Sequence, residues 1–389
     1  MSMEQFLPRR TLIVEDEKDV QTLIQMTFKD HGIREVYCVS DGEEAWKELQ
    51  KYDYELLVLD WKLPVLSGKR LLNRIRADRR LKYLPIIVLS GFLETGDVTF
   101  VNENFFTANM QKPFNQDDLM KISRTILRDR FDFQKIFEKA EETFFNLSGQ
   151  GLGRVREVLN TWLQNFGQNP VGTSLVASIM RHFHIFDHAS SIISTTMTVH
   201  KNNPLLHHQQ ALNQLCLGNF TGAFGNLEKA HQLCPINQGR ILLLGKLAIH
   251  QGDLKTAVEY FKKAEELDSG SPSLKRCLEI VEFVEHRMGK EKVEDLENGI
   301  ASLLNIMGAD KVRQGLYLEG QEHCEHALIF AKSPDAKAAI YYNLGICEAR
   351  RGNKKEAVSY FYRSIDIRPN YTNSINALEQ FGIDVMNAG

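Results

Sequence analysis

The sequence predicts two parts, a doubly wound parallel α/β domain followed by an all-α array of helical repeats. Two observations predict this fold class. Short apolar runs alternate with helical patterns up to about residue 128. Beyond Arg130 the strand-like runs stop, and a 34-residue period appears among helical stretches. The chain of 389 residues is long enough for both parts.

Five short apolar runs are the expected strands, at residues 10–15, 35–40, 55–60, 86–90 and 106–111. Helical patterns separate them at 17–30, 42–51, 67–77 and 94–104, and a last helix begins near Asn115. Short, continuously apolar strands that alternate with helices indicate a parallel sheet covered on both faces.

Composition excludes several classes of protein. Charged residues make up 25% and hydrophobic residues 43%, as in ordinary globular proteins. A net charge of −3 gives no general attraction to DNA or to membranes, and no apolar stretch approaches the roughly 18 residues of a membrane span. The N-terminus lacks the pattern of a secretory signal, and the six cysteines form no C-x-x-C pair. We therefore expect a cytoplasmic protein with reduced thiols, without direct DNA binding and without a membrane segment.

Polar residues stand where the predicted strands end. Glu15 and Asp16 end the first strand, Asp60 the third and Ser90 the fourth, and Lys112 follows the fifth. The carboxyl ends of parallel strands form the binding edge of such sheets, so these five residues should meet. Clustered carboxylates favour a hard cation such as Mg²⁺. A hydroxyl and an ammonium can hold phosphoryl oxygens, so the pattern indicates phosphoryl transfer.

These residues resemble the CheY-like receiver domain of two-component response regulators. Three intervals match that family: 44 residues from Asp16 to Asp60, 30 from Asp60 to Ser90, and 22 from Ser90 to Lys112. The resemblance covers residues 9–128 and implies a flavodoxin-like, five-stranded fold. The motifs that carry it are Ile13-Val14-Glu15-Asp16-Glu17, Leu59-Asp60-Trp61-Lys62-Leu63-Pro64, Val88-Leu89-Ser90-Gly91 and Lys112-Pro113-Phe114.

The resemblance implies a role for each residue. Asp60 would accept a phosphoryl group from a histidine kinase or a phosphotransfer protein, and Ser90 and Lys112 would contact that group. The bond between Lys112 and Pro113 would be cis. Mg²⁺ would be the cofactor, held by Glu15, Asp16, Asp60 and the backbone carbonyl of Lys62.

One position departs from the family pattern. Receiver domains usually carry an aromatic residue three positions before the lysine, and it turns inward on phosphorylation. Here that position is Asn109. Phe105 and Phe106 lie nearby, but they are expected to pack in the core at the last strand. Transmission through an aromatic switch is therefore in question, whereas phosphorylation is not.

The second part of the chain repeats small and bulky residues at a fixed step. Ala189, Ala223 and Ala257 are 34 residues apart, and the bulky positions four residues later keep the same step. A later pair of units shares the pattern at a spacing of 37, with Gly315 matching Gly352. Such a period predicts helical hairpins whose small residues let the helices approach closely. Neighbouring units then stack into a superhelix, because none can bury its apolar face alone.

These stretches look like tetratricopeptide repeats. The best matches are Leu244-Gly245 with Gly252-Asp253, and Leu344-Gly345 with Gly352-Asn353. Coverage is about 137–380, in about six units, with a plain helical bundle as the alternative. Residues 272–300 fit poorly and form a divergent unit or a flexible joint. We expect a receiver domain at 1–128, a helical linker at 129–150 and the repeat domain at 151–389.

Tetratricopeptide arrays bind peptides or protein surfaces in a concave groove. The mixture of cationic and apolar groups expected there would suit an acidic, hydrophobic ligand. From the repeat columns, the side chains expected to face the groove are His208, Leu212, Leu242, Lys246, Ile249, Arg313, Tyr342 and Arg350.

The sequence thus favours a response regulator whose output is protein binding. Phosphorylation would expose or hide the groove, or change self-association, for example as a homodimer. We expect no enzyme activity beyond the receiver's own phosphorylation and dephosphorylation. The alternative is a constitutive interaction scaffold whose receiver domain only docks to a kinase or drains phosphate from it, and Asn109 favours that alternative.

Overall fold

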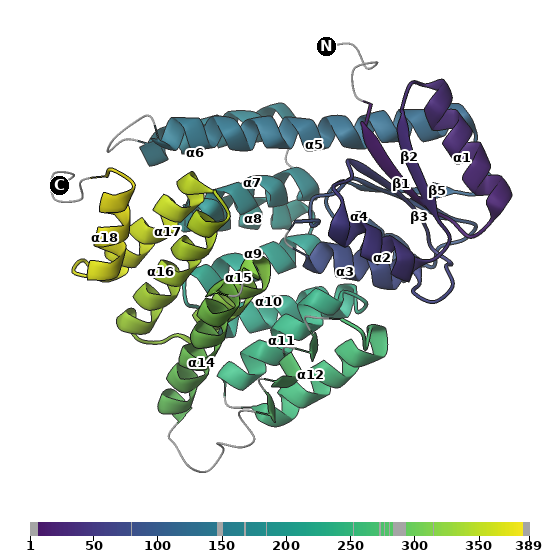
Figure 1. Ribbon diagram of the computed structural model, residues 1–389. Helices are drawn as coiled ribbons and strands as arrows, with labels where there is room; N and C mark the ends of the chain where they lie inside the picture. Colours follow the sequence, from purple (N-terminus) through teal and green to yellow (C-terminus); the bar gives the residue numbers. More distant parts are fainter. Residues whose placement is uncertain are drawn as a thin grey trace. The chain divides into compact units, whose positions relative to one another are not determined.

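The chain contains a parallel sheet near its N-terminus and a long series of helices (Figure 1). The computed structural model describes residues 7–383 except 79, 146–150, 167–168, 184, 252, 272–273, 276, 280, 283–292 and 314. By its internal contacts the chain separates into two units, Met1–Leu244 with Lys263–Ser271, and Gly245–Lys262 with Pro272–Gly389. The boundaries expected at residues 128 and 150 follow the sequence pattern, and they stay a prediction.

Five parallel strands form one sheet in the order β2-β1-β3-β4-β5, which confirms the predicted flavodoxin-like topology. The strands are β1 (Arg10–Val14), β2 (Glu35–Val39), β3 (Leu56–Asp60), β4 (Ile86–Ser90) and β5 (Thr107–Gln111). The helices between them are α1 (Lys18–Asp30), α2 (Gly42–Lys51), α3 (Gly68–Ala77) and α4 (Thr95–Asn102).

Both faces of the sheet are covered, which explains why β3 and β4 are apolar at nearly every position. Every residue of these two strands is buried. On one face, Leu57 and Leu59 pack in a core with residues of α2, α3 and α4. On the other face, Leu56 and Val58 pack in a core with residues of α1 and α5. A strand buried on both sides needs apolar residues at consecutive positions rather than at alternate ones.

The fifth helix, α5, is one continuous segment from Gln116 to Phe145. It begins at the sheet, as expected, and continues past residue 128 without a break. Phe133 lies in its second half, with ring-centroid distances of 5.3 Å to Tyr83 and 5.6 Å to Phe106. Phe106 and Phe133 belong to a core that extends to Leu206. The predicted core packing of Phe106 is confirmed, and this core joins the start of β5 to the first helices after the sheet.

The remaining described helices confirm the all-α repeat part. Ala189, Ala223 and Ala257 are fully buried on α8, α10 and α12, which are second helices of hairpins. The helices are α6 (Gly151–Phe166), α7 (Pro170–His182), α8 (Phe186–Val199), α9 (Pro204–Cys216), α10 (Phe220–Leu233), α11 (Gln238–His250), α12 (Leu254–Leu267), α14 (Val293–Arg313), α15 (Tyr317–Phe330), α16 (Pro334–Arg350), α17 (Lys354–Ile367) and α18 (Thr372–Gln380).

Local sequence explains where the hairpins begin and why their helices touch. Proline occupies the first turn of α7, α9 and α16, and the preceding Asn169, Asn203 and Ser333 accept a hydrogen bond from that turn. At the crossing of α16 and α17, a Cβ on Gly345 would lie 2.4 Å from the ring of Phe361. Only glycine permits this approach. The poorly fitting segment 272–300 lies partly outside the described residues, and its residues 293–300 begin α14.

Of the helices described, none combines the length and the apolar character that crossing a bilayer requires.

We predict that Gly68→Ala destabilises the receiver fold. A Cβ at Gly68, the first residue of α3, would lie 2.3 Å from the backbone oxygen of Asp60. Because that neighbour is main chain, we expect a loss of about 1–3 kcal/mol in urea unfolding followed by tryptophan fluorescence. Gly96→Ala in α4 is the control, since a Cβ there meets no described heavy atom within 4 Å. It should leave stability unchanged or slightly raised, and equal losses in both variants would contradict this account.

Candidate functional site

Three carboxylates meet at the carboxyl ends of β1 and β3. One oxygen each of Glu15, Asp16 and Asp60 lies within 4.8 Å of the other two. The strand register explains this, because Val14 pairs with Leu59 and the acidic residues come next. Glu15 and Asp60 are buried, whereas Asp16 is exposed. The order of the strands reverses between β1 and β3, which is where ligands bind in doubly wound sheets.

Lys112 reaches this cluster from the end of β5. Its Nζ lies 2.7 Å from Oε2 of Glu15 and 3.2 Å from Oδ1 of Asp60. Its backbone N–H donates to the carbonyl of Ser90 at 2.8 Å, so the end of β5 stays paired with β4. The bond between Lys112 and Pro113 is cis, as expected.

Ser90 ends β4 next to Asp60 and is 4% exposed. Its hydroxyl oxygen has no hydrogen-bond partner among the described residues. An unpaired buried hydroxyl costs about 1–3 kcal/mol, so each such group calls for a partner or a functional reason. Its position beside the carboxylates fits a hydrogen bond to an oxygen of a group attached to Asp60. The five residues expected at this edge therefore lie together.

The electrostatics of the cluster are unbalanced. Burial raises the pKa of Asp60 and that of Glu15, and the nearby ammonium of Lys112 opposes both shifts. Burial lowers the pKa of Lys112, but its hydrogen bond to Glu15 and the charge of Asp60 outweigh this, so the net shift is upward. Among the described side chains of this cluster, the ammonium of Lys112 stands against three carboxylates. A divalent cation would supply the missing positive charge.

The donor set fits Mg²⁺. Carboxylate oxygens are the hard ligands that Mg²⁺ prefers, and one exposed carboxylate leaves room for the water molecules it usually keeps. Glu15, Asp16 and Asp60 would hold the ion. Lys62 lies two residues beyond Asp60, in the loop before α3, and its side chain is exposed. The role of its backbone carbonyl as a ligand stays a prediction.

Three residues beside this cluster were not anticipated. Trp61 follows Asp60, and its indole Nε1–H donates to Oδ2 of Asp97 in α4 at 2.9 Å. Lys69 of α3 holds the other oxygen of Asp97, at 2.6 Å. Trp61 is 6% exposed and Asp97 is 8% exposed. The tryptophan directly after the acidic residue is the only sequence signal of this contact, and the sequence does not reveal its partner.

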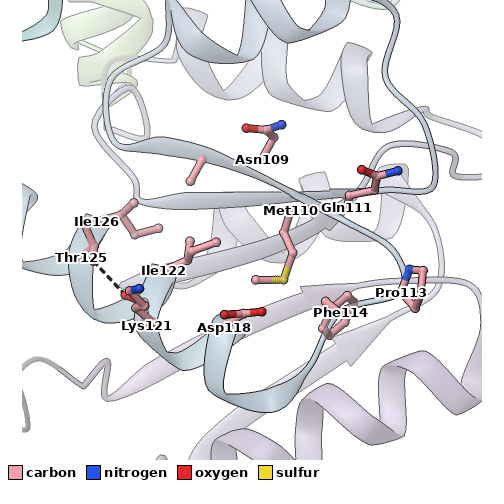
Figure 2. A pocket seen from close by; sticks show the side chains of 11 residues that line it. Asn109, Met110, Gln111, Pro113, Phe114, Asp118, Lys121, Ile122, Thr125 and Ile126 are labelled. Atoms are coloured by element: carbon pink, nitrogen blue, oxygen red, sulfur yellow. Dashed lines mark hydrogen bonds between the residues drawn. The ribbon is translucent and has the colours of Figure 1, made fainter.

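Asn109, at the position of the usual aromatic residue, is exposed on β5. Figure 2 shows its side chain on the side of the strand opposite Met110, which points toward Asp118. A cavity of about 460 Å³ lies here, apart from the carboxylate cluster. It is lined by Ala108, Asn109, Met110, Gln111, Pro113, Phe114, Asp118, Lys121, Ile122, Thr125 and Ile126.

Five of the eight side chains expected in the repeat groove, the polar and charged ones, have different surroundings. His208 is half-buried, and burial lowers its pKa to about 3. Lys246 is 6% exposed, and its ammonium lies 2.6 Å from an imidazole of α15. Tyr342 packs its ring against two aromatic rings of α17 and the following turn. Arg313 and Arg350 are exposed. Partner binding by these residues stays a prediction.

We predict that Asp60→Asn stabilises the protein near neutral pH when no divalent cation is present. The raised pKa of Asp60 means that the fold binds its proton more tightly than the unfolded chain does. The protonated carboxyl of Asp60 therefore stabilises the fold below its ordinary pKa of 3.8. This contribution is lost as the pH rises through the raised pKa. We expect Asp60→Asn to gain about 0.5–2 kcal/mol at pH 7.5.

Thermal unfolding at pH 7.5 and pH 4 in the presence of a chelator measures this difference. The gain from Asp60→Asn should shrink at the lower pH, because the wild-type carboxyl then binds its proton. Asp53→Asn is the control, since that side chain is 89% exposed and its neutralisation should have little effect. If Asp60→Asn is less stable than wild type at pH 7.5, burial of the ionised Asp60 carboxylate does not destabilise the fold.

Comparison with known families agrees with this geometry. Residues 11–124 match the response regulator receiver domain, and residues 241–270 and 299–370 match tetratricopeptide repeats. The five residues of the carboxylate edge all lie inside the receiver match.

Among curated relatives, the response regulator Rre1 of Synechocystis is 32% identical over 120 residues, which are 31% of this chain and 52% of Rre1. The chemotaxis protein CheY-3 of Vibrio cholerae is 28% identical over 33% of this chain and 92% of its own. CheY1 of Helicobacter pylori is 33% identical over 21% of this chain and 66% of its own. The shared region is thus about half of Rre1 and a third or less of this chain. The chain joins a response regulator receiver domain to tetratricopeptide repeats.

Proposed function

We propose that Asp60 is the phosphoacceptor of this receiver and that a histidine kinase or a phosphotransfer protein supplies the phosphoryl group. A receiver domain places the chain in two-component signalling. The observation that carries the assignment to Asp60 is its buried carboxylate, which lies beside two further carboxylates and 3.2 Å from the ammonium of Lys112. The unpaired hydroxyl of Ser90 at the end of the neighbouring strand supports the same site.

The proposed chemistry is a single displacement at phosphorus. A carboxylate oxygen of Asp60 bonds to phosphorus as the bond from phosphorus to the donor imidazole breaks, and the imidazole leaves with the electron pair. Bound Mg²⁺ would neutralise charge on the phosphoryl oxygens. Lys112 and Ser90 hold those oxygens by charge and by a hydrogen bond. The burial of Asp60 would limit the access of bulk water to the acyl phosphate.

We propose further that the repeats bind a partner protein and that the state of Asp60 changes this binding or the self-association of the chain. The repeat matches support protein binding, because stacked helical hairpins form extended binding surfaces. Phosphorylation and its reversal are the only chemistry that we assign to the chain. Its place in the cytoplasm stays a prediction.

The alternative is a constitutive scaffold whose receiver only docks to a kinase or drains its phosphate. The observation that favours it is the exposed amide of Asn109 where receivers usually carry an aromatic residue. Under this alternative the repeats would not respond, whether the receiver only docks to the kinase or also takes up its phosphoryl group at Asp60.

We predict that incubation with acetyl phosphate and Mg²⁺ adds about 80 Da to the protein as one labile phosphoryl group. Asp60→Asn should abolish the adduct, and a chelator should strongly reduce it. Ser90→Ala should slow uptake by roughly 10²-fold, because one oxygen-holding donor is lost. Intact-mass spectrometry measures all of these, with Asp53→Asn as a control that should react like wild type. Persistence of the adduct in Asp60→Asn would exclude Asp60 as the acceptor.

We also predict that partner binding by the full chain depends on phosphorylation. Affinity capture with the wild-type chain, with and without acetyl phosphate, should change recovery of at least one partner by roughly 5–150-fold, the usual range of coupling between two sites. Asp60→Asn should show no such change. Identical recovery in both states of wild type would favour the constitutive scaffold.

A further inference from the structure

The receiver contacts the start of α11 and the end of α12 through one defined surface. This α3–α4 surface consists of Arg70, Asn73 and Arg74 of α3 together with Glu103, which directly follows α4. Its partners are residues 236–240 at the start of α11 and residues 267–268 at the end of α12. All of these residues belong to the same compact unit.

A buried ion pair joins Glu103 to α11. Nη2 of Arg240 lies 2.6 Å from Oε2 of Glu103, and the two side chains are 1% and 3% exposed. Asn237 donates to the other carboxylate oxygen at 2.6 Å. Arg240 also donates to the carbonyls of Ala230 and Cys234, so this guanidinium organises the turn before α11. A buried pair of this kind is specific in geometry, because a charge left without its partner is strongly unfavourable.

The contacts of α3 form a second, separate group. The guanidinium of Arg74 donates to both carboxylate oxygens of Asp268, at 2.7 and 3.0 Å. Asn73 accepts from the backbone N–H of Gln238 at 3.0 Å, and Arg70 donates to the carbonyl of Leu267 at 2.9 Å. These bonds anchor the repeat helices on α3 independently of α4.

The helix α4 contacts the residue after Asp60 at its N-terminal end and the start of α11 at its C-terminal end. Asp97, in its first turn, accepts the indole N–H of Trp61, the residue after Asp60. Glu103, which holds Arg240, stands at its C-terminus. The six-residue step from Asp97 to Glu103 corresponds to roughly 9 Å of helix, a rigid length that can carry a displacement.

We propose that α4 transmits the state of Asp60 to the repeats, through Trp61 and Asp97 at its start and through Glu103 and Arg240 at its end. This inference rests on the proposed function. A phosphoryl group adds about −1.5 to −2 charge to the receiver. That charge repels the carboxylate of Asp97 and attracts the ammonium of Lys69, which now holds Asp97 at 2.6 Å. Both contacts at the start of α4 are thereby altered together.

This route explains how a receiver with Asn109 can still signal. The aromatic group that responds is the indole beside the phosphoacceptor rather than a ring on β5. The buried end of the route is the ion pair between Glu103 and Arg240, so its rearrangement changes how the start of α11 is held. The contacts of α3 with α11 and α12 hold the receiver on these helices while the ion pair rearranges.

Amide hydrogen exchange on the full chain tests the proposal. Beryllium fluoride with Mg²⁺ serves as the phosphoryl mimic, and residues 236–241 are the readout. We expect the mimic to change exchange there at least threefold in wild type and much less in Trp61→Phe, which loses the indole donor. Trp46→Phe is the matched control, because that ring packs partly buried in the same core but outside the route. It should respond like wild type.

Glu103→Gln gives a second variant that keeps an acceptor for Asn237 and removes the charge opposite Arg240. It should speed exchange at 236–241 at least threefold without any mimic, while uptake from acetyl phosphate stays within twofold of wild type. A full response in Trp61→Phe, or unchanged exchange in Glu103→Gln, would overturn the proposal. If wild type gains the phosphoryl adduct but 236–241 do not respond, only this inference fails. If wild type gains no adduct, the proposed function fails as well.

Discussion

The parallel pairing of β1 with β3 is the constraint on which the site depends. It sets Val14 beside Leu59, so the acidic residues that follow β1 and the aspartate that ends β3 come together whatever their mutual repulsion. Burial makes this arrangement costly, as the raised pKa values of Glu15 and Asp60 indicate. Lys112 offsets part of the cost through contacts of 2.7 and 3.2 Å. The remaining imbalance is what prepares the edge for a divalent ion and an anionic group.

The same sheet also determines how the receiver is joined to the repeats. At one side, Phe106 precedes β5 and packs with Phe133 of the long helix α5, in a core that continues into the next helices. At another, the α3–α4 surface holds the start of α11 and the end of α12. Because the receiver is attached to the following helices at two separate places, it is packed against them rather than loosely tethered. The second attachment is the one through which we propose that a charge change at Asp60 reaches α11.

Much of the fold and of the site follows from sequence because their signals are local or periodic. Apolar runs and their intervals placed the strands within a residue or two, and the strand-end rule brought Glu15, Asp60 and Ser90 to one edge. The step of 34 residues marked buried alanines on the second helices of successive hairpins. The repeat columns indicated which side chains face the groove but not what they contact, since helix faces with charges look alike whether they bind a ligand or water. Lys246, for example, is buried against α15.

The sequence by itself determined the fold class, the carboxylate edge and the repeat period, because side-chain periodicity reports which face of a strand or helix is buried. Only the tertiary structure decided which side chains from distant elements meet. Glu103 and Arg240 are 137 residues apart, and no pattern in the chain marks either as the partner of the other. Nor does the sequence tell whether the indole of Trp61 points to water or to Asp97. Such contacts depend on how whole helices pack, and packing is settled by the sum of many apolar contacts rather than by any local motif.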